Sequence, residues 1–507
     1  MTVKFVYDPK RKEVKIESDY FSNIREAFSV KNPGARYSRF ARFVPQRIYA
    51  ITPAGYCGIG LVPEIIKYLK SLNIPFDIVY DQLLEDTLKG IPFLIPTGYP
   101  SIKTLESKFQ LRDYQKEAYI KAINYGSGVI ELATGGGKTF IIANVAYTAL
   151  QLLQSNERVL IIVPDIGLVG QTYKDFTDYG FPMETVTKWT GTHEINLSAR
   201  VVIANLGILQ SKKSDLSWFK EVGMLIVDEC HKLRHGNKVN KLLNKIPTHR
   251  CIGFTGTLPE SELDKWNIYS NLGPVIFKKT TTGLREAAGG EYIANAQALT
   301  LYLQYDRIPD YTSVSANQKY LFELDFIHTS EFRGKVIMNV VSKLTNNCLI
   351  LVDHINHGDI LYKVLSGIQG KQIYFIQGSV EVEDRQKIQQ LMEKENNVVC
   401  IAISKIFSTG ISIKNIHYIM FAAGGKSKIK VLQSIGRGLR THKDKDMLIL
   451  IDVVDDLIYG KKHYKKRKEF YEIEKIKNCR KNYLRKKLRL KLKRKNQKKL
   501  KSLVPQH

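Results

Sequence analysis

The stretch Val129-Ile-Glu-Leu-Ala-Thr-Gly-Gly-Gly-Lys-Thr139, followed by Phe140-Ile-Ile142, determines how the rest of the chain is interpreted. It is typical of a short buried strand, a glycine loop and the first turn of a helix, which together point backbone N–H groups at phosphate. Three glycines let the backbone approach an oxyanion closely, Lys138 reaches the β- and γ-phosphates, and the Thr139 hydroxyl binds Mg²⁺. The strict loop pattern begins with glycine, where this chain has Leu132. We therefore predict an ATP and Mg²⁺ site made by Leu132, Ala133, Thr134, Gly135, Gly136, Gly137, Lys138 and Thr139.

A second motif supplies acidic groups. Met224-Leu-Ile-Val-Asp-Glu-Cys-His231 is an apolar strand that ends in two adjacent carboxylates. Asp228 is suited to hold Mg²⁺, and Glu229 to orient and deprotonate the attacking water. Such a pair is often only a helix cap, but this one follows the phosphate loop by 90 residues (228 − 138), which leaves room for the intervening strands and helices. The catalytic interpretation is favoured. The turn Thr255-Gly256-Thr257 ends a further strand and is suited to sensing phosphate.

Composition and charge favour a polyanionic partner. Of the net charge of +28, residues 461–501 contribute +18, from 21 Lys and Arg against 3 Glu. The six cysteines are scattered without a C-x-x-C pair, which suggests neither a zinc site nor a disulfide framework. No apolar run is long enough to span a membrane, and the N-terminus does not resemble a signal peptide. We expect a cytoplasmic protein without a membrane partner.

Residues 1–100 differ in pattern from the remainder of the chain. Val3–Tyr7 and Val14–Glu17 alternate as strands, and helices are expected near 22–28 and 62–72. Residues 36–47 interleave arginines with Tyr37, Phe40 and Phe43, which suits a grip on nucleic acid and equally an ordinary edge strand. We predict a small accessory α+β domain, followed by a proline-containing linker.

From residue 111 onward, strands alternate with helices, which predicts parallel sheets with helices on both faces. Gln115 begins a helix just before the phosphate loop, where its amide can pair with adenine; alone, such a residue is more often at the surface. A second α/β unit from residue 284 lacks a phosphate loop. In it, Arg437 and Arg440 lie on one helical face and suit arginine fingers, although isolated arginines are more often surface charges.

Together these motifs resemble those of superfamily 2 helicases. The matching segments, in chain order, are Gln115, Thr134–Thr139, Val163–Pro164 with Gln171, Asp228–His231, Thr255–Thr257, Thr409–Gly410 and Gln433–Arg440. Residues 353–358, 407–415 and 426–437 further resemble the phage recombination and repair helicases of the UvsW type. The resemblance covers about residues 105–455.

The resemblance implies two RecA-like parallel-sheet domains in tandem, preceded by the small α+β domain and followed by a basic helical or disordered tail. The expected bounds are 1–100, 101–283, 284–460 and 461–507. The implied catalytic residues are Lys138, Asp228, Glu229, His231, Arg437 and Arg440, with Thr139 and Asp228 binding Mg²⁺. Thr255, Gly256, Thr257 and Gln433 would couple hydrolysis to movement, and Gln171, Thr409 and Gly410 would contact nucleic acid.

The function implied is an ATP-dependent DNA helicase or translocase that tracks a single strand and remodels forks, Holliday junctions, and D- or R-loops. Phage recombination or single-strand-binding proteins are candidate partners. An RNA-directed or transcript-release ATPase remains an alternative. A non-catalytic nucleic-acid-binding protein is a second alternative, but it would require the loss of a catalytic group, and Lys138, Glu229 and Arg437 are all present.

Overall fold

The computed structural model describes residues 2–32, 35, 44–79, 104–211, 214–236, 238–286, 295–312, 314–315, 318–377, 382–404, 413, 415–423 and 447–484. The chain divides into two compact units, Met1–Thr280 and Thr281–His507. Five of the predicted site residues, Thr409, Gly410, Gln433, Arg437 and Arg440, lie outside the described residues, as do residues 36–43 of the arginine and aromatic stretch.

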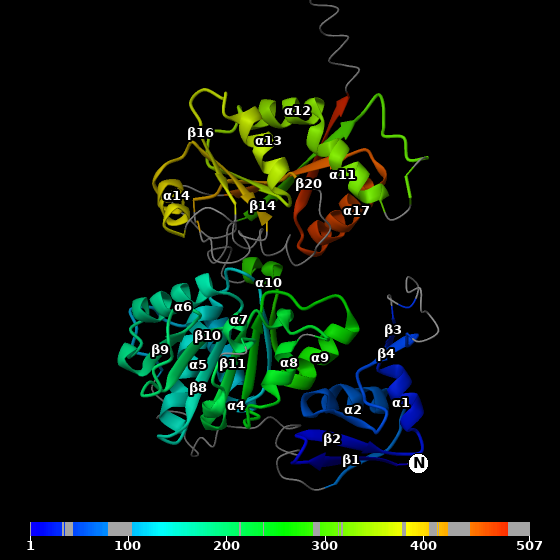
Figure 1. Cartoon of the computed structure of the whole chain (residues 1–507), viewed down its shortest axis with the longest axis vertical. Helices are drawn as coiled ribbons and strands as arrows, with labels where there is room; N and C mark the ends of the chain where they lie inside the picture. Colours follow the sequence, from blue (N-terminus) through cyan, green and yellow to red (C-terminus); the bar gives the residue numbers. More distant parts are fainter. Residues whose placement is uncertain are drawn as a thin grey trace, which may run out of the picture. The chain divides into compact units, whose positions relative to one another are not determined.

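The first unit begins with a small α+β domain, as predicted. Its mixed sheet has the order β5 (Tyr56–Gly58), β2 (Glu13–Glu17), β1 (Val3–Asp8), β6 (Phe76–Ile78), with β1 antiparallel to β2 and parallel to β6. Helices α1 (Phe21–Ala27) and α2 (Val62–Ser71) lie beside this sheet (Figure 1). They contribute Ile24, Ile65 and Leu69 to its core. Strands β3 (Ser29–Lys31) and β4 (Arg47–Tyr49) form a second, antiparallel pair.

The rest of the first unit is a seven-stranded sheet in which every described pair of strands is parallel. Its order is β13 (Val275–Lys279), β7 (Gly128–Leu132), β12 (Cys251–Thr255), β11 (Val222–Asp228), β8 (Arg158–Val163), β10 (Val201–Asn205), β9 (Val186–Trp189). The helices around it are α4 (Asp113–Tyr125), α5 (Lys138–Leu152), α6 (Ile166–Asp178), α7 (Leu206–Leu209), α8 (Lys238–Leu243) and α9 (Glu262–Leu272) (Figure 1). Because both faces are covered, the central strands are apolar throughout, rather than alternating.

This topology brings distant motifs together. Strands β7, β12 and β11 are neighbours, and in a parallel sheet their carboxyl ends lie at one edge. In the ladder, Ile130 pairs with Phe254, which pairs with Asp228. The phosphate loop after β7, the threonine turn after β12 and the carboxylates that end β11 therefore share that edge.

The second unit carries another seven-stranded sheet, again with every described pair parallel. Its order is β16 (Gln372–Ile376), β17 (Val398–Ile403), β15 (Cys348–Val352), β18 (Tyr418–Phe421), β19 (Met447–Asp455), β14 (Asn295–Gln304), β20 (Lys477–Leu484). Its helices are α10 (Thr281–Glu286), α11 (Lys319–Thr329), α12 (Glu331–Val341), α13 (Ile355–Leu365), α14 (Val382–Lys394) and α17 (Ile458–Ile473). The prediction of two RecA-like sheets in tandem is confirmed.

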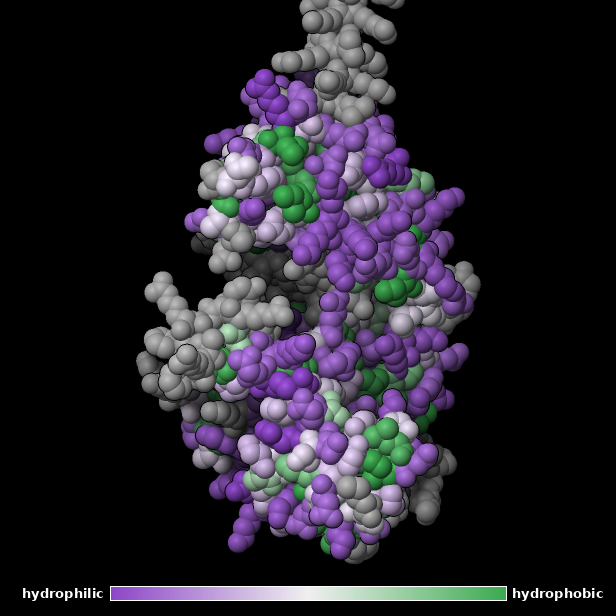
Figure 2. All heavy atoms as spheres, turned by 90° about the vertical axis from the view of Figure 1, so that its right-hand side faces the viewer, coloured by the Kyte–Doolittle hydropathy of each residue, from purple (hydrophilic) through white to green (hydrophobic). Residues whose placement is uncertain are grey.

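We expected a basic tail from residue 461 onward. Residues 461–484 instead form most of α17 and all of β20, which are parts of the second unit. The guanidinium of Arg467, 1% exposed, binds the buried carboxylate of Asp452 at 2.8–3.1 Å, and the Tyr471 hydroxyl donates to the same carboxylate. Strand β20 pairs with β14 along its whole length. Hydrophilic side chains cover most of the surface on the α17 side of this unit (Figure 2). The exposed cations of α17 are Lys461, Lys462, Lys465, Lys466 and Lys468.

No helix in the part of the chain that the structure describes is both long and apolar enough to cross a bilayer.

Candidate nucleotide site

The phosphate loop joins the end of β7 to the start of α5. Gly135 and Gly137 have φ angles of 88° and 78°, in the left-handed region that glycine adopts without steric cost. A side chain at Gly136 would come within 2.7 Å of Leu132. Because α5 begins directly at Lys138, its unpaired N-terminal N–H groups border the loop. This is a cradle for an anionic group, and the residues present fit the phosphates of a nucleotide.

The cation of the loop faces the carboxylates that end β11. Lys138 Nζ lies 3.9 Å from Glu229 Oε1, and the two side chains are 11% and 17% exposed. Burial, together with the adjacent Glu229 carboxylate, raises the pKa of Asp228 to about 6, against the opposing effect of Lys138. A carboxylate pair of this kind is stabilised by a divalent cation, so the donor set also fits Mg²⁺.

Glu229 is held in an unusual backbone conformation. Its φ of 50° lies in the left-handed region, which residues other than glycine seldom adopt. It directly precedes a short 3₁₀ turn, Cys230–Lys232, and from there its carboxylate faces both Lys138 and His231. Nothing in the sequence pattern indicated this conformation.

A chain of polar contacts links Glu229 to the threonine turn. The buried ring of His231 places Nδ1 3.1 Å from Glu229 Oε2 and 3.0 Å from Thr255 Oγ1. The Thr255 hydroxyl donates its one proton to the Thr257 carbonyl at 3.0 Å, so it accepts from His231. With this arrangement Nδ1 donates to the Thr255 hydroxyl, and the Glu229 carboxylate lies within ion-pair distance of the same nitrogen.

The threonine turn also lies against the phosphate loop. A side chain added at Gly256 would come within 3.0 Å of Thr134 Oγ1 and 3.7 Å of Lys138 Nζ. The predicted coupling residues Thr255, Gly256 and Thr257 thus lie together beside the loop, while the fourth, Gln433, lies outside the described residues.

Gln115 contacts the phosphate loop itself. Its buried amide accepts from the Arg112 backbone N–H at 2.9 Å and donates to the Gly136 carbonyl at 2.9 Å. The Tyr114 hydroxyl donates to the same carbonyl at 3.1 Å. Sequence reasoning missed Tyr114, and its only sequence signal is an aromatic residue in the first turn of the helix that carries Gln115.

Comparisons with known proteins identify the domains that carry this site. Residues 108–260 match the family model described as the type III restriction enzyme res subunit, and residues 334–442 match the helicase conserved C-terminal domain. The chain is a superfamily 2 helicase. It resembles the ATP-dependent DNA helicase UvsW of Enterobacteria phage T4, with 26% identity over 463 residues that cover 89% of each chain.

Two further comparisons extend this result. The helicase is 26% identical over 412 residues to the DNA 3'-5' translocase XPB2 of Sulfurisphaera tokodaii, covering 74% of this chain and 86% of that one. A fragment of a putative HsdR subunit of a type I restriction enzyme from Vibrio vulnificus YJ016 has the same fold, with a TM-score of 0.55 and 16% identity over 75% of this chain and 70% of that one. The two domain matches and the similarity to the T4 helicase show that the protein is an ATP-hydrolysing helicase.

The predicted nucleic-acid contact Gln171 lies at one edge of the first sheet. It belongs to residues 166–171, which open α6 after β8, and residues 206–210 follow β10, the neighbour of β8. Gln171 is half-buried on α6, and Ile166 is 55% exposed at its start. In the second unit, Ser404 directly follows β17, and its hydroxyl donates to the Val352 carbonyl at 3.1 Å.

Proposed function

We propose that this helicase is a DNA-directed motor. It uses ATP hydrolysis to unwind or branch-migrate forks, Holliday junctions, and D- or R-loops in phage replication, recombination and repair. The observation that carries the ATPase part is the shared edge of the first sheet, where the phosphate loop, the paired carboxylates and the His231–Thr255 contact meet. The names of the T4 and Sulfurisphaera relatives support DNA as the track.

In this proposal the nucleotide lies on the loop of residues 132–139. Backbone N–H groups of Gly135–Gly137 and the ammonium of Lys138 bind the phosphates, while Gln115 pairs with adenine. Thr139 and Asp228 hold Mg²⁺, which when bound neutralises charge on the phosphates.

Glu229 is the proposed general base. Its carboxylate is kept in place by His231, whose Nδ1–H lies between Glu229 and Thr255. Lys138 Nζ lies 3.9 Å from Glu229 Oε1, and a bound γ-phosphate would offer the ammonium a stronger anionic partner. Glu229 is then able to accept a proton from the attacking water.

The remaining roles belong to the two RecA-like domains together. Arg437 and Arg440 are proposed to contact the γ-phosphate as arginine fingers, and Gln433 to couple nucleotide state to movement. Gln171, Thr409 and Gly410 are proposed to contact the backbone of the tracked strand. We assign residues 101–280 to the first motor domain, residues 281–484 to the second, which includes α17 and β20, and residues 1–100 to the accessory domain.

The test is a nucleic-acid-stimulated ATPase assay with single-stranded, forked and four-way DNA, and with RNA of matched length. We expect the highest kcat/KM with forked or four-way DNA. Stimulation by RNA equal to that by DNA would replace the proposal with the RNA-directed alternative.

A further inference from the structure

Helix α9 holds the segment that comes after the catalytic carboxylates. The Asn267 side chain donates through Nδ2 to the Leu233 carbonyl at 2.8 Å. Ile268 and Leu272 on the same helix belong to one buried cluster with Cys230 and Leu233. The residues on both sides of His231 are therefore packed against α9.

This contact bears directly on Glu229. A non-glycine residue keeps a left-handed conformation only where the surrounding structure enforces it. Glu229 directly precedes the turn Cys230–Lys232, and α9 binds Leu233, the residue that follows this turn. In a second contact, the His235 backbone N–H donates to Asp264 of α9 at 3.0 Å. Displacing α9 would release the restraint on Glu229.

The N-terminal domain packs on α9 through close backbone contacts. A methyl group at Gly60 would overlap the Tyr269 carbonyl oxygen, and one at Gly58 would come within 2.5 Å of the Ser270 carbonyl oxygen. The ring of Trp266 lies 5.1 Å from that of Phe28. The two glycines permit an approach that no other residue allows, so the domain is fitted to this helix.

Two hydrogen bonds fix the domain elsewhere on the same lobe. The Lys12 ammonium donates to the Ile246 carbonyl at 3.1 Å, and the Tyr7 hydroxyl bonds His249 Nε2 at 2.9 Å. The N-terminal domain therefore contacts both α9 and the segment between α8 and β12.

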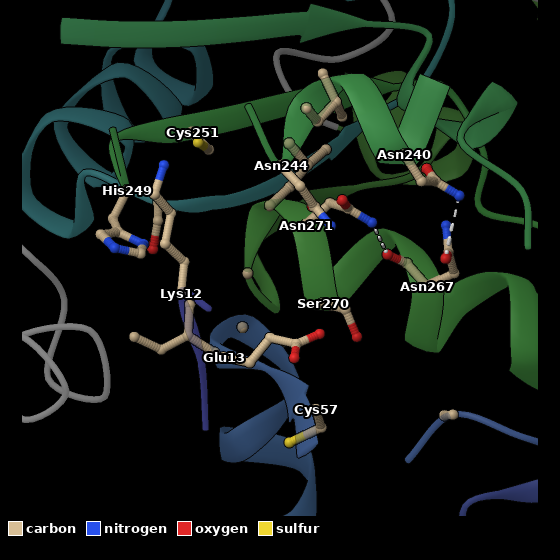
Figure 3. Close-up of a pocket in the computed structure, with 18 of the residues that line it drawn as sticks. Lys12, Glu13, Cys57, Asn240, Asn244, His249, Cys251, Asn267, Ser270 and Asn271 are labelled. Atoms are coloured by element: carbon tan, nitrogen blue, oxygen red, sulfur yellow. Dashed lines mark hydrogen bonds between the residues drawn. The ribbon is translucent and has the colours of Figure 1, made fainter. Parts of the chain in front are cut away.

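A cavity of about 280 Å³ lies beside α9 at this junction, and none of residues 132–139 lines it. Figure 3 shows residues of both parts that surround it. Lys12, Glu13 and Cys57 line it from the N-terminal domain, and Asn240, Asn267, Ser270 and Asn271 from the motor lobe. Asn240 donates to Asn267 Oδ1 at 3.2 Å, which orients the Asn267 amide so that its N–H groups face Leu233. Gly58 and Gly60 also line this cavity, and their close contacts with Ser270 and Tyr269 restrain α9 from the side of the N-terminal domain.

We propose that the N-terminal domain sets the rate of ATP hydrolysis through α9, and that Asn267 is a positioning residue for Glu229. The inference rests on the proposed role of Glu229 as general base. On this inference the N-terminal domain contributes to catalysis. Its contacts hold α9 in place, α9 in turn holds Leu233, and the Glu229 carboxylate therefore stays directed at the nucleotide site.

The first test changes the hydrogen bond between Asn267 and the Leu233 carbonyl. Asn267→Asp keeps the size of the side chain but removes the N–H that donates to Leu233. We expect kcat for DNA-stimulated ATP hydrolysis to fall about tenfold, since displacements near 1 Å cost up to roughly 10²-fold. KM for ATP should stay within about twofold, because the phosphate loop is untouched. Asn271→Asp is the matched control, since its amide donates only along α9, to the Asn267 carbonyl; it should keep a normal kcat.

The second test acts from the other side of α9. Gly60→Ala should push α9 away from the domain and lower kcat with an unchanged KM. Gly367→Ala, where a side chain meets nothing within 4 Å, is the control. Because both variants act through one helix, Gly60→Ala combined with Asn267→Asp should lower kcat by less than the product of the single effects.

Thermal melts of each variant separate positioning from folding. A lower Tm with normal kcat per folded molecule in both variants would overturn the inference, as would multiplicative effects in the double variant. The two proposals fail differently. If the wild-type protein hydrolyses no ATP with any nucleic acid, the proposed function is wrong, whereas active wild type with equally active variants refutes the role of α9 alone.

Discussion

Replacing Glu229 and Lys138 one at a time distinguishes a general base from a phosphate ligand. Both side chains face the same space, with Nζ and Oε1 3.9 Å apart. Glu229→Gln keeps the size of the side chain and removes its basicity. Lys138→Ala removes the ammonium and leaves Glu229 in place. The two changes therefore act on different steps, although the residues are neighbours.

The expected magnitudes depend on these contacts. Loss of a general base costs roughly 10²-fold or more in turnover, or about 2.7 kcal/mol of transition-state stabilisation. Glu229→Gln should nevertheless bind ATP at least as tightly as wild type, because it removes a negative charge that faces the phosphates. A hydrogen bond between charged groups contributes about 1.5–3 kcal/mol, so Lys138→Ala should weaken ATP binding roughly 10- to 150-fold.

Equilibrium titration with a fluorescent ATP analogue, together with phosphate release at saturating DNA, measures both quantities. Glu221→Gln is the matched control: Glu221 pairs with Arg158 at 3.0 Å, at the opposite end of β11 from Glu229. It should leave affinity and turnover unchanged. Equal loss of ATP affinity in Glu229→Gln and Lys138→Ala would refute the assignment of Glu229 as the base.

Four further changes test other parts of the molecule. Arg437→Ala should lower the hydrolysis rate far more than ATP affinity, because an arginine finger acts mainly on the transition state; a lower Tm with a normal rate would make it structural. Deleting residues 485–507 should leave the maximal ATPase rate intact but make the slope of log K against log salt shallower, by about 0.9 per lost phosphate contact, measured by anisotropy with forked DNA. Arg467→Ala leaves the buried Asp452 carboxylate without its cation and should cost about 3–5 kcal/mol in denaturant unfolding of the second unit. Burial and Arg333 lower the pKa of His328 from 6.5 to about 4. As the pH falls from 6.5 toward 4, the unfolded chain binds a proton at this histidine and the folded chain does not, so the stability of the fold decreases. His328→Phe should therefore show a smaller drop in Tm over that range.

The sequence predicted the parts of the fold that depend on local patterns. Apolar strands followed by glycine or acidic turns are short-range signals, and in a parallel sheet such turns meet at one edge. Those signals suffice to place Lys138, Glu229 and Thr255 together. They do not give the register that aligns β7, β12 and β11, because register depends on packing across the whole sheet.

Local sequence patterns do not predict which charged residues are buried. Arg467 stands among exposed lysines, and nothing nearby in the sequence distinguishes it from them. Arg467 is buried because it pairs with Asp452, which lies on strand β19. This ion pair binds α17 to the sheet of the second unit. Arg333 is similar, since this helical arginine is 1% exposed and binds Asp455, which lies far along the chain. Interactions of this kind are read only from the folded chain.

Gln115 shows how a predicted role and an observed contact can both hold. A glutamine amide has two N–H donors and an oxygen with two lone pairs. The contacts to the Arg112 N–H and the Gly136 carbonyl use one donor and one lone pair. Adenine pairing requires one more of each, so a bound base adds to the contact with the phosphate loop and does not replace it. The amide would then link the base to the backbone that holds the phosphates, and loss of Gln115 would disturb the loop even where the base is absent.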